Sequence, residues 1–465
     1  MSNSLEVIVL AAGKGTRMKS ALPKVLHPIA GKAMVHHVVD TALALNPNTI
    51  HLVVGHGAQA VRDSFDTTNW KEKLKAAHCT INFVEQTEQL GTGHAVMQAA
   101  PHLSEQGVAL ILYGDVPLIK QNTLRQVVSA TNSGLSLLTQ ILADPTGYGR
   151  IKRNEEKKIT AIVEQKDASE PELAIQEINT GVMALACDKL KSWLPKLSNN
   201  NAQKEYYLTD LVGLAADDQV GIHAVHPQFA WEPQGVNNRV QQAELERALQ
   251  TDQANILMAD GLYLSDPKRF DLRGALSFGS DCSIDVNCVI EGDVRLGDDV
   301  SIGPFCYLKN CTIDSGSNIA AYTSIDDSSL GKHTNVGPYA RLRPGTTLAD
   351  QAKIGNFVET KKARIGKGSK VNHLSYVGDT EMGEEVNVGA GTITCNYDGV
   401  NKHKTTIEDD VFIGSNSALV APLTLKKGAT IGAGSTITRT TPENTLTLTR
   451  AKQLSLPDWK RPTKK

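Results

Sequence analysis

Hydrophobic and polar positions alternate in two different ways along this chain. Up to residue 237, short runs of Val, Ile and Leu alternate with amphipathic stretches, which predicts buried strands separated by helices. The predicted strands are residues 6–10, 50–54, 108–112, 135–140 and 221–225, and the predicted helices include residues 33–44, 122–130 and 208–216. Apolar strands between helices favour an α/β domain with a mainly parallel sheet and helices on both faces.

Residues 237–259 contain neither Gly nor Pro, and their apolar side chains recur at loosely helical spacing. This stretch predicts one continuous helix joining two domains. We expect a first domain at residues 1–239, a linker helix at 240–260 and a second domain at 261–465, which fits a length of 465 residues at roughly 100–200 per domain.

From residue 284 the aliphatic residues recur with a period of mostly six. The series is Ile284, Ile290, Leu296, Ile302, Leu308, Ile313, Ile319, Ile325, Leu330, Val336, Leu342, Leu348, Ile354, Ile365, Val371, Val377, Met382, Val388, Ile407, Ile413, Leu419, Leu425, Ile431 and Ile437. A hexapeptide period is the signature of a parallel β-helix, in which three units close one triangular coil. The aliphatic side chains point into the prism, and the coils stack.

Composition agrees with this division. Residues 279–438 hold 20 of the 38 glycines, while all four tryptophans lie outside that range. Glycine supplies the turn conformations that a coiled repeat needs, and a narrow prism interior admits aliphatic and small side chains better than an indole ring.

Charge, chain ends and cysteines exclude several classes of protein. The net charge of -2 gives no reason to expect a nucleic-acid partner. No run of ~20 apolar residues predicts a membrane span, and the N-terminus lacks the basic region of a signal peptide. Seven scattered cysteines without a C-x-x-C pair favour reduced thiols. We therefore expect a cytoplasmic protein.

The first predicted strand leads into the glycine-rich loop AAGKGTRM at residues 11–18. A strand followed by a small, glycine-rich loop presents backbone N–H groups to phosphate oxygens. Both a Walker A loop and a dinucleotide-binding G-x-G-x-x-G would need glycine where Met18 stands. The loop therefore favours phosphate binding of another kind.

This loop and the following LPKVL at residues 22–26 resemble the sugar-1-phosphate nucleotidylyltransferases. More closely, residues 5–462 resemble the bacterial bifunctional N-acetylglucosamine-1-phosphate uridylyltransferase / glucosamine-1-phosphate N-acetyltransferase family. The resemblance also rests on QTEQLGTGH at 86–94, YGDVP at 113–117, GYGR at 147–150, IVE at 162–164, EINTG at 177–181 and GVNNR at 235–239.

The resemblance implies that the first domain transfers a uridylyl group from UTP to N-acetylglucosamine-1-phosphate and releases pyrophosphate. It implies nucleotide- or sugar-binding roles for Leu10, Ala11, Ala12, Gly13, Lys24, Gln86, Gly91, Thr92, Tyr113, Gly114, Asp115, Gly149, Glu164, Asn179 and Asn237. Of these, Asp115 and Asn237 are expected to hold Mg²⁺ through oxygen ligands, as a hard cation requires. The chain departs from the family pattern at Gln234, where Glu is expected, and at residues 66–78, which form a longer loop than usual.

For the second domain the resemblance implies a left-handed β-helix that acetylates glucosamine-1-phosphate with acetyl-CoA. Amine acetylation needs a general base, and a histidine suits proton transfer near neutral pH. By resemblance His373 is this catalytic base. Substrate is expected at Arg343, Lys361, Tyr376, Asn387 and Lys402, and acetyl-CoA at Ala390, Asn396, Tyr397, Ser415, Ala433 and Arg450.

The resemblance also implies a homotrimer built through the β-helix, with acetyl sites between subunits. Two alternatives stay open on the sequence. A single-function nucleotidylyltransferase of the ADP-glucose or mannose-1-phosphate type would use the β-helix for allostery or assembly, but it leaves His373 and its polar companions unexplained. A non-catalytic scaffold leaves Lys24, Asp115 and Asn237 unexplained.

Overall fold

The computed structural model describes residues 4–464 and divides into two compact units, one ending at Leu249 and the other beginning at Gln250. The division falls within helix α9 (Arg239–Ala259), which covers most of the stretch expected as a linker helix. Within residues 4–464, the helices are all too short or too polar to cross a membrane.

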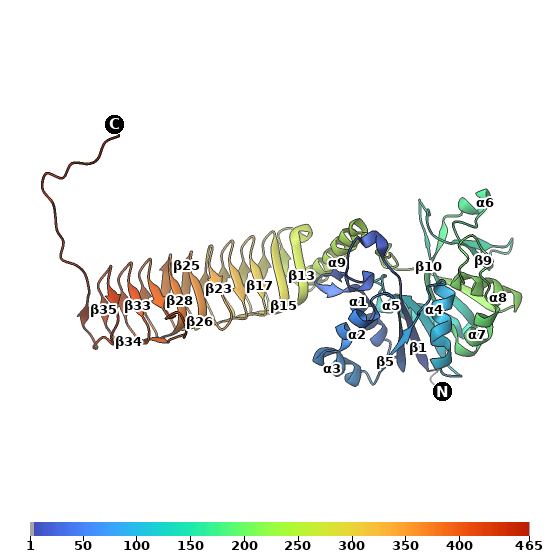
Figure 1. Ribbon diagram of the computed structural model, residues 1–465, viewed down its shortest axis with the longest axis horizontal. Coiled ribbons are helices and arrows are strands. Elements are labelled where there is room, and N and C mark those ends of the chain that lie inside the picture. Colours follow the sequence, from blue (N-terminus) through green and yellow to red (C-terminus); the bar gives the residue numbers. More distant parts are fainter. Residues whose placement is uncertain (1–3, 465) are drawn as a thin grey trace. The chain divides into compact units, whose positions relative to one another are not determined.

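Unit 1 is built on a mixed sheet with the strand order β11-β7-β10-β6-β1-β4-β5 and a hairpin, β8–β9, beside β10 (Figure 1). The strands are β1 (Leu5–Ala11), β4 (Thr49–Val54), β5 (Thr80–Glu85), β6 (Val108–Tyr113), β7 (Gly134–Ile141), β8 (Arg150–Arg153), β9 (Ile159–Val163), β10 (Glu177–Ala186) and β11 (Gly221–Val225). A small ladder joins β2 (Pro28–Ile29) to β3 (Lys32–Ala33). β10 runs antiparallel to β6 and β7, whereas the other neighbours on the main path pair in parallel.

Both faces of this sheet are buried, as the unbroken apolar runs predict. In β1, Ile8 and Leu10 belong to one core cluster, while Val7, Val9 and Ala11 belong to the cluster on the opposite face. One face packs on α4 (Thr92–Ala99), α7 (Cys187–Trp193) and α8 (Leu211–Asp217), and the other on α1 (Met34–Leu43), α2 (Ala58–Phe65) and α5 (Gln121–Ala130). The predicted α/β class with a mainly parallel sheet is confirmed.

Residues 66–78, which we expected to form a long loop, contain helix α3 (Thr68–Ala76). Thr67 caps the helix by accepting a hydrogen bond from Trp70 N at 3.3 Å. Trp70 is 5% exposed and packs against Phe65 at a ring-centroid distance of 4.7 Å. The extra length therefore adds a docked helix on the side of β5 and leaves the carboxyl ends of β1 and β6 unaltered. A short helix, α6 (Glu170–Leu173), follows the β8–β9 hairpin.

Unit 2 is a stack of parallel coils (Figure 1). We call its two ladders sheet I and sheet II. Sheet I consists of β12 (Tyr263–Leu264), β14 (Ser283–Ile284), β16 (Ser301–Ile302), β19 (Asn318–Ile319), β22 (Asn335–Val336), β25 (Lys353–Asn356), β27 (Lys370–His373), β29 (Asn387–Val388), β32 (Phe412–Ile413), β35 (Thr430–Ile431) and β37 (Leu446–Thr447). Sheet II wraps the other faces and consists of β13 (Phe270–Ser277), β15 (Cys288–Leu296), β17 (Tyr307–Lys309), β18 (Thr312–Ile313), β20 (Ser324–Asp326), β21 (Ser329–Leu330), β23 (Arg341–Leu342), β24 (Thr347–Leu348), β26 (Glu359–Ile365), β28 (Tyr376–Met382), β30 (Ile393–Cys395), β31 (Thr405–Ile407), β33 (Ala418–Val420), β34 (Leu423–Leu425) and β36 (Thr436–Ile437).

The predicted aliphatic series forms the core of these coils, and every member of it is buried. Parallel register stacks equivalent positions directly on one another, so that one column runs through Ile302, Ile319, Val336, Ile354 and Val371. The predicted parallel β-helix is confirmed, and the coils are consistent with a left-handed β-helix.

Two threonines replace aliphatics in one inner column. Thr360 stacks between Leu342 and Val377, and Thr394 follows in line with Leu419. Their hydroxyls are satisfied inside the prism, because Thr360 Oγ1 bonds Thr346 Oγ1 at 3.0 Å and Thr394 Oγ1 accepts from the backbone N–H of Gly378 at 2.8 Å. The gaps in the aliphatic series at these positions are thus filled by hydrogen-bonded polar residues.

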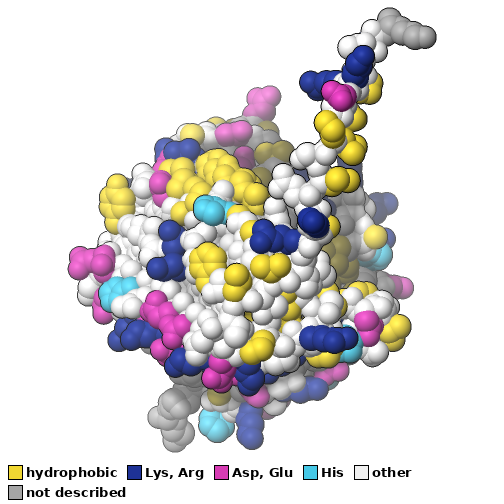
Figure 2. Space-filling view, turned by 90° about the vertical axis from the view of Figure 1, so that its left-hand side faces the viewer, with side chains coloured by type: hydrophobic (Ala, Val, Ile, Leu, Met, Phe, Trp, Pro, Cys, Tyr) yellow, Lys and Arg dark blue, Asp and Glu magenta, His cyan; other side chains and the backbone are white. Residues whose placement is uncertain are grey.

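Beyond β37, the described residues form no further helix or strand. This tail extends away from the coils and carries both hydrophobic and basic side chains (Figure 2). Leu454, Leu456 and Trp459 are each at least 66% exposed.

Candidate active sites

A cavity of about 280 Å³ lies in unit 1 where β1 and β6 end. The carboxyl edge of parallel strands is the usual place of a ligand site in open α/β sheets. Gly114 N–H donates to Leu10 O at 2.9 Å, which joins the loops after the two strands. The cavity is lined by Leu10, Ala11, Ala12, Gly13, Lys24, Val25, Gln86, Gln89, Gly91, Thr92, Ala95, Tyr113, Asp115 and Glu205. The residues expected to bind the nucleotide thus lie together, apart from Asn237.

Lys24 is the centre of a polar cluster at this cavity. Its ammonium group forms an ion pair with Asp115 and donates a hydrogen bond to Asn237 Oδ1 at 2.7 Å. Arg17 Nη2 donates to the same oxygen at 2.9 Å. The loop after β1 reaches Lys24 because position 15 is glycine, with φ of +60° and a Cβ position only 2.5 Å from Lys24 Cβ. Oxygens from two separate loops therefore converge on one cationic nitrogen.

The opposite end of the cavity is formed around Gln86, which is 5% exposed. Its amide Nε2 lies 3.2 Å from Gly91 O and 3.1 Å from His94 Nδ1, so the orientation of the amide is fixed. Thr92 Oγ1 accepts a hydrogen bond from Leu208 N at 3.2 Å. These contacts hold the start of α4 against the segment that carries Glu205.

The residues expected to bind the amino sugar also lie together. Asn179 N–H donates to Gly149 O at 2.9 Å, and Glu164 Oε1 lies 3.3 Å from the Cβ position of Gly149. Gly181, with φ of +91°, allows β10 to approach Tyr113, since a Cβ atom there would lie 2.5 Å from the Tyr113 ring. Tyr113 therefore connects the sugar-side group with the nucleotide cavity.

This region is poorly solvated. Burial raises the pKa of Tyr113, and the nearby carboxylates of Glu164 and Asp115 raise it further. Burial also raises the pKa of Glu164, against the effect of Thr209, whose hydroxyl donates to Glu164 Oε1 at 3.0 Å. Hydrogen bonds from these groups to a ligand are strengthened by the low local dielectric.

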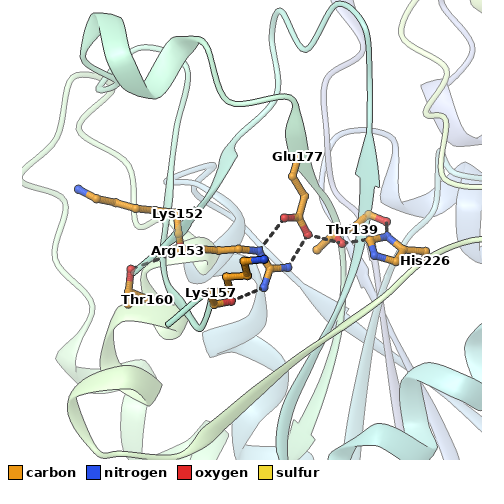
Figure 3. A network of polar contacts seen from close by, with 7 residues as sticks. All are labelled: Thr139, Lys152, Arg153, Lys157, Thr160, Glu177 and His226. Atoms are coloured by element: carbon orange, nitrogen blue, oxygen red, sulfur yellow. Dashed lines mark hydrogen bonds and ion pairs between the residues drawn. The ribbon is translucent and has the colours of Figure 1, made fainter. Parts of the chain in front are cut away.

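A polar network fixes the hairpin that carries Gly149 and Glu164 (Figure 3). Arg153 on β8 donates through Nε and Nη2 to both carboxylate oxygens of Glu177 on β10, each at 2.8 Å. Thr139 on β7 donates to the same carboxylate at 2.9 Å and lies beside His226. A bidentate Arg–carboxylate pair is geometrically specific, so the hairpin is held in register with the strand of Asn179.

In unit 2, His373 and Asn356 occupy the same register position in successive coils. His373 Nδ1 lies 2.5 Å from Asn356 Oδ1. A carbonyl oxygen only accepts hydrogen bonds, so Nδ1 carries the proton and Nε2 keeps its lone pair. Asn356 therefore sets the tautomer in which His373 acts as a base through Nε2.

Several residues expected to bind acetyl-CoA continue along the edge that carries His373. Backbone hydrogen bonds carry this edge from coil to coil: His373 O accepts from Gly391 N, Ala390 O from Asn416 N, and Ser415 O from Gly434 N, at 2.7–3.2 Å. Ala433 follows next. Arg450 lies beside it, since Arg450 Nη2 is 3.7 Å from the Cβ position of Gly432.

The remaining residues predicted for the second domain lie elsewhere on the prism. Arg343, Lys361 and Tyr376 follow one another on sheet II, whereas Asn387 lies on sheet I. Arg343 Nη1 donates to Glu359 Oε1 at 2.8 Å. Side chains that point outward from different faces of one prism diverge.

A third group lies in the loop that interrupts the repeat between β30 and β31. Asn396 is 5% exposed and its amide donates to Asp379. Tyr397 and Lys402 pair across the loop, with Lys402 Nζ 4.8 Å from the Tyr397 ring centroid. One chain therefore presents the predicted residues as three separate groups.

Sequence reasoning missed three residues at these sites. Gln89, which donates to Ala12 O at 2.9 Å, stands inside the quoted stretch 86–94 but was given no role. Asn356 lies 17 residues before His373, one coil away, so the coil period was sufficient to find it. Glu205 carries no local signal, because it reaches the cavity through the backbone pairing of Tyr206 with Leu90 at 2.8 Å.

Three family models match this chain. A MobA-like NTP transferase domain matches residues 7–196, a GMPPB C-terminal domain matches residues 272–363, and a hexapeptide repeat of succinyl-transferase matches residues 404–439. A solved structure of UDP-glucose pyrophosphorylase complexed with UDP-glucose covers 54% of this chain and 99% of its own, at 19% identity and a TM-score of 0.45.

Curated relatives match over almost the entire chain. The proteins named Bifunctional protein GlmU from Saccharophagus degradans and Idiomarina loihiensis are 56% and 55% identical, each over 99% of this chain and 100% and 99% of their own lengths. The protein of the same name from Chromobacterium violaceum is 53% identical over 100% of this chain and 99% of its own. The chain therefore belongs to the bifunctional GlmU family.

Proposed function

We propose that this protein carries out two successive reactions. Unit 2 transfers the acetyl group of acetyl-CoA to the amine of glucosamine-1-phosphate. Unit 1 then transfers a uridylyl group from UTP to the resulting N-acetylglucosamine-1-phosphate and releases pyrophosphate. The observation that carries the proposal is the convergence of Asp115 and Asn237 on Lys24 beside the nucleotide-sized cavity. Membership in a family named bifunctional favours two activities over the single-function and scaffold alternatives.

In uridylyl transfer, a phosphate oxygen of the sugar phosphate attacks the α-phosphorus of UTP, and the bond from that phosphorus to the β-phosphate oxygen breaks. Such a reaction needs alignment and charge neutralisation more than covalent chemistry. Gln86, Gly91 and Thr92 would hold the uridine end, while Lys24 would meet phosphate as a point charge. Gly149, Glu164 and Asn179 would bind the amino sugar, with the phenol of Tyr113 between the two substrates.

The residues at Asp115 and Asn237 fit Mg²⁺. A carboxylate and an amide oxygen already converge on a cation there, and Mg²⁺ typically takes one or two protein oxygens together with substrate phosphates and water. Among residues 4–464, no group of three or more His, Cys, Asp or Glu could hold a metal ion, so the nucleotide phosphates would complete this site. When bound, the ion would neutralise phosphate charge during the transfer.

In acetyl transfer, the substrate amine nitrogen attacks the thioester carbonyl carbon and the bond from carbon to sulfur breaks. His373 Nε2 takes the amine proton, which then passes to the CoA thiolate. Asn356 holds the ring in the tautomer that this step needs. Arg343 and Lys361 supply positive charge for the substrate phosphate, and the edge through Ala390, Ser415 and Ala433 would hold acetyl-CoA together with Asn396, Tyr397 and Arg450.

We place the complete acetyl site between copies of the chain, in a homotrimer. Asn387 lies on sheet I and Tyr376 on sheet II, while Lys402 lies in the loop between β30 and β31. Residues that diverge on one prism can face each other across the groove between two prisms. A neighbouring copy would therefore supply the groups that one chain holds apart.

An exposed aromatic ladder supports this assembly. Phe305, Tyr322, Tyr339 and Phe357 stack in successive coils with centroid distances of 4.8–5.2 Å, and each is 46–54% exposed. All four have φ of 56–60°, a backbone conformation that is costly for bulky residues. Phe357 directly follows Asn356, so the ladder runs along the edge that carries His373. Strained, exposed aromatic rings in line with the candidate site are typical of a covered surface.

The double variant Tyr322→Glu/Tyr339→Glu tests this assembly. We expect it to keep its β-sheet circular dichroism, to sediment as a monomer and to lose acetylation, while uridylylation is retained. Tyr263→Glu, at an aromatic residue that is 64% exposed outside the ladder, is the control and should sediment as the parent does. If the double variant kept the parent's sedimentation, the ladder would be a feature of the single prism only.

The two activities are tested in one assay that follows CoA thiol and pyrophosphate release. We expect His373→Ala to abolish acetylation and leave uridylylation intact, and Asp115→Ala to do the reverse. Loss of both activities in either folded variant would contradict separate sites. Both substrates and the free state of the cysteines fit a reducing compartment, which supports the expected cytoplasmic location.

A further inference from the structure

We propose that Glu232 is a positioning residue that sets the separation of Asp115 and Asn237, and with it the affinity of unit 1 for a divalent cation. The proposal rests on the function proposed for these two residues. Glu232 lies outside the cavity, is fully buried, and has no part in the uridylyl chemistry described above.

Glu232 joins the two loops that carry the oxygen ligands. Its Oε2 accepts the backbone N–H of Lys120 at 3.1 Å, and its Oε1 accepts the backbone N–H of Phe229 at 2.9 Å. Lys120 ends the loop that begins at Asp115, and Phe229 begins the loop that ends at Asn237. One buried carboxylate therefore connects both loops at the side away from the cavity.

A second connection closes the arrangement at the ligand side. Val236 N–H, next to Asn237, donates to Asp115 O at 2.9 Å, and Val236 is fully buried. Asp115 stands five residues before Lys120, and Glu232 stands five residues before Asn237. The two five-residue segments are thus tied at both ends, so neither ligand can move away without breaking a buried hydrogen bond.

The packing around Glu232 favours this role over a solvent-exposed one. Lys120 Nζ lies 5.2 Å from the ring centroid of Trp231, which stacks on Phe229 at 5.1 Å. These groups cover the carboxylate. A buried carboxylate is costly unless it is hydrogen-bonded, and here its two bonds go to backbone groups of the two ligand loops.

The test measures cation binding directly and uses acetylation as an internal control. In Glu232→Gln, one of the two N–H donors faces an amide NH₂ group in place of an oxygen. Loss of an outer partner of a metal site typically weakens metal affinity about 10–100-fold. We expect Mn²⁺ binding in the presence of UTP, followed by electron paramagnetic resonance, to weaken by that factor. We also expect the Mg²⁺ concentration for half-maximal uridylylation to rise similarly, with recovery at high Mg²⁺ and unchanged acetylation.

Two further variants make the result decisive. Glu232→Asp keeps the charge on a shorter side chain and provides a milder test if Glu232→Gln fails to fold. Gln234→Ala, in the same loop, is the matched control and should bind Mn²⁺ as the parent does. If Asp115→Asn abolishes Mn²⁺ binding while both Glu232 variants bind like the parent, Glu232 is not a positioning residue. If Asp115→Asn also binds like the parent, the cation site itself is wrong.

Discussion

His373 and Asn356 meet across two coils of the β-helix, with His373 Nδ1 2.5 Å from Asn356 Oδ1. Because this contact fixes the tautomer of the proposed base, Asn356→Ala should lower kcat for acetylation about 10²-fold, the lower end of what a positioned base contributes. Uridylylation should not change. Asn356→Asp retains an acceptor and should lie closer to the parent. Parent-like acetylation in Asn356→Ala would remove Asn356 from the mechanism.

Lys24 occupies the place where the two oxygens of the proposed cation site converge. In Lys24→Met, uridylylation should fall about 10²–10³-fold, as for loss of one charge-stabilising donor. Mn²⁺ binding without nucleotide should become tighter, because the ammonium no longer occupies the space between Asp115 and Asn237. Electron paramagnetic resonance measures this binding, with the exposed Lys19→Met as control. Weaker Mn²⁺ binding in Lys24→Met would show that the ammonium does not compete with the cation.

Glu164 links the sugar-side group to stability. Burial raises its pKa above the usual 4.5, so the folded protein is favoured below pH 4.5 and loses this contribution as pH rises through the raised pKa. Glu164→Gln does not ionise. Its free energy of unfolding relative to the parent should therefore increase as pH rises from 4.5, and then level off.

The same variant should bind sugar less well. The KM for N-acetylglucosamine-1-phosphate should rise about 10-fold, the effect of losing a hydrogen bond to a charged group. Chemical denaturation across pH and steady-state kinetics check the two expectations, with Glu170→Gln on the exposed α6 as control. A variant that is less stable than the parent at neutral pH would contradict the sign of the pKa shift.

Leu342 is fully buried in an inner column between Ile325 and Thr360. Leu342→Ala should destabilise the β-helix by about 2–5 kcal/mol, because rigid stacked coils cannot close around the cavity. Thermal unfolding should show a lower transition for unit 2 only, and uridylylation at 25 °C should persist. Val400→Ala, at a side chain that is 83% exposed, should change stability by less than about 0.5 kcal/mol.

Both architectures were predictable because their signals are local and repeated. The buried columns follow from the six-residue period, and the α/β class follows from apolar strands such as residues 6–10. The antiparallel direction of β10 was not predictable, since no residue of a strand encodes its neighbour's direction. The helix at Thr68–Ala76 was missed because its single buried indole, Trp70, gives little amphipathic pattern.

For the candidate sites, the sequence located residues that lie within contiguous motifs, such as Lys24 and Asp115. It could not supply contacts made by chain segments far apart in sequence. Glu232 looks like an ordinary loop carboxylate until the fold brings Lys120 to it, 112 positions away. The division of the acetyl residues among separate faces likewise depends on how the coils close, which the repeat period alone does not specify.

The in-register columns also limit how such a chain can change length during evolution. Equivalent positions are 17 residues apart from Ile302 to Ile319 and 18 apart from Val336 to Ile354, so a deletion of one whole coil would restore every inward-facing position beyond it. A deletion of two or three residues would instead turn aliphatics outward in all later coils. Insertions are tolerated as outward loops, as between Val388 and Ile413, which are paired although 25 residues apart. Length variation among relatives should therefore occur in whole coils or in loops.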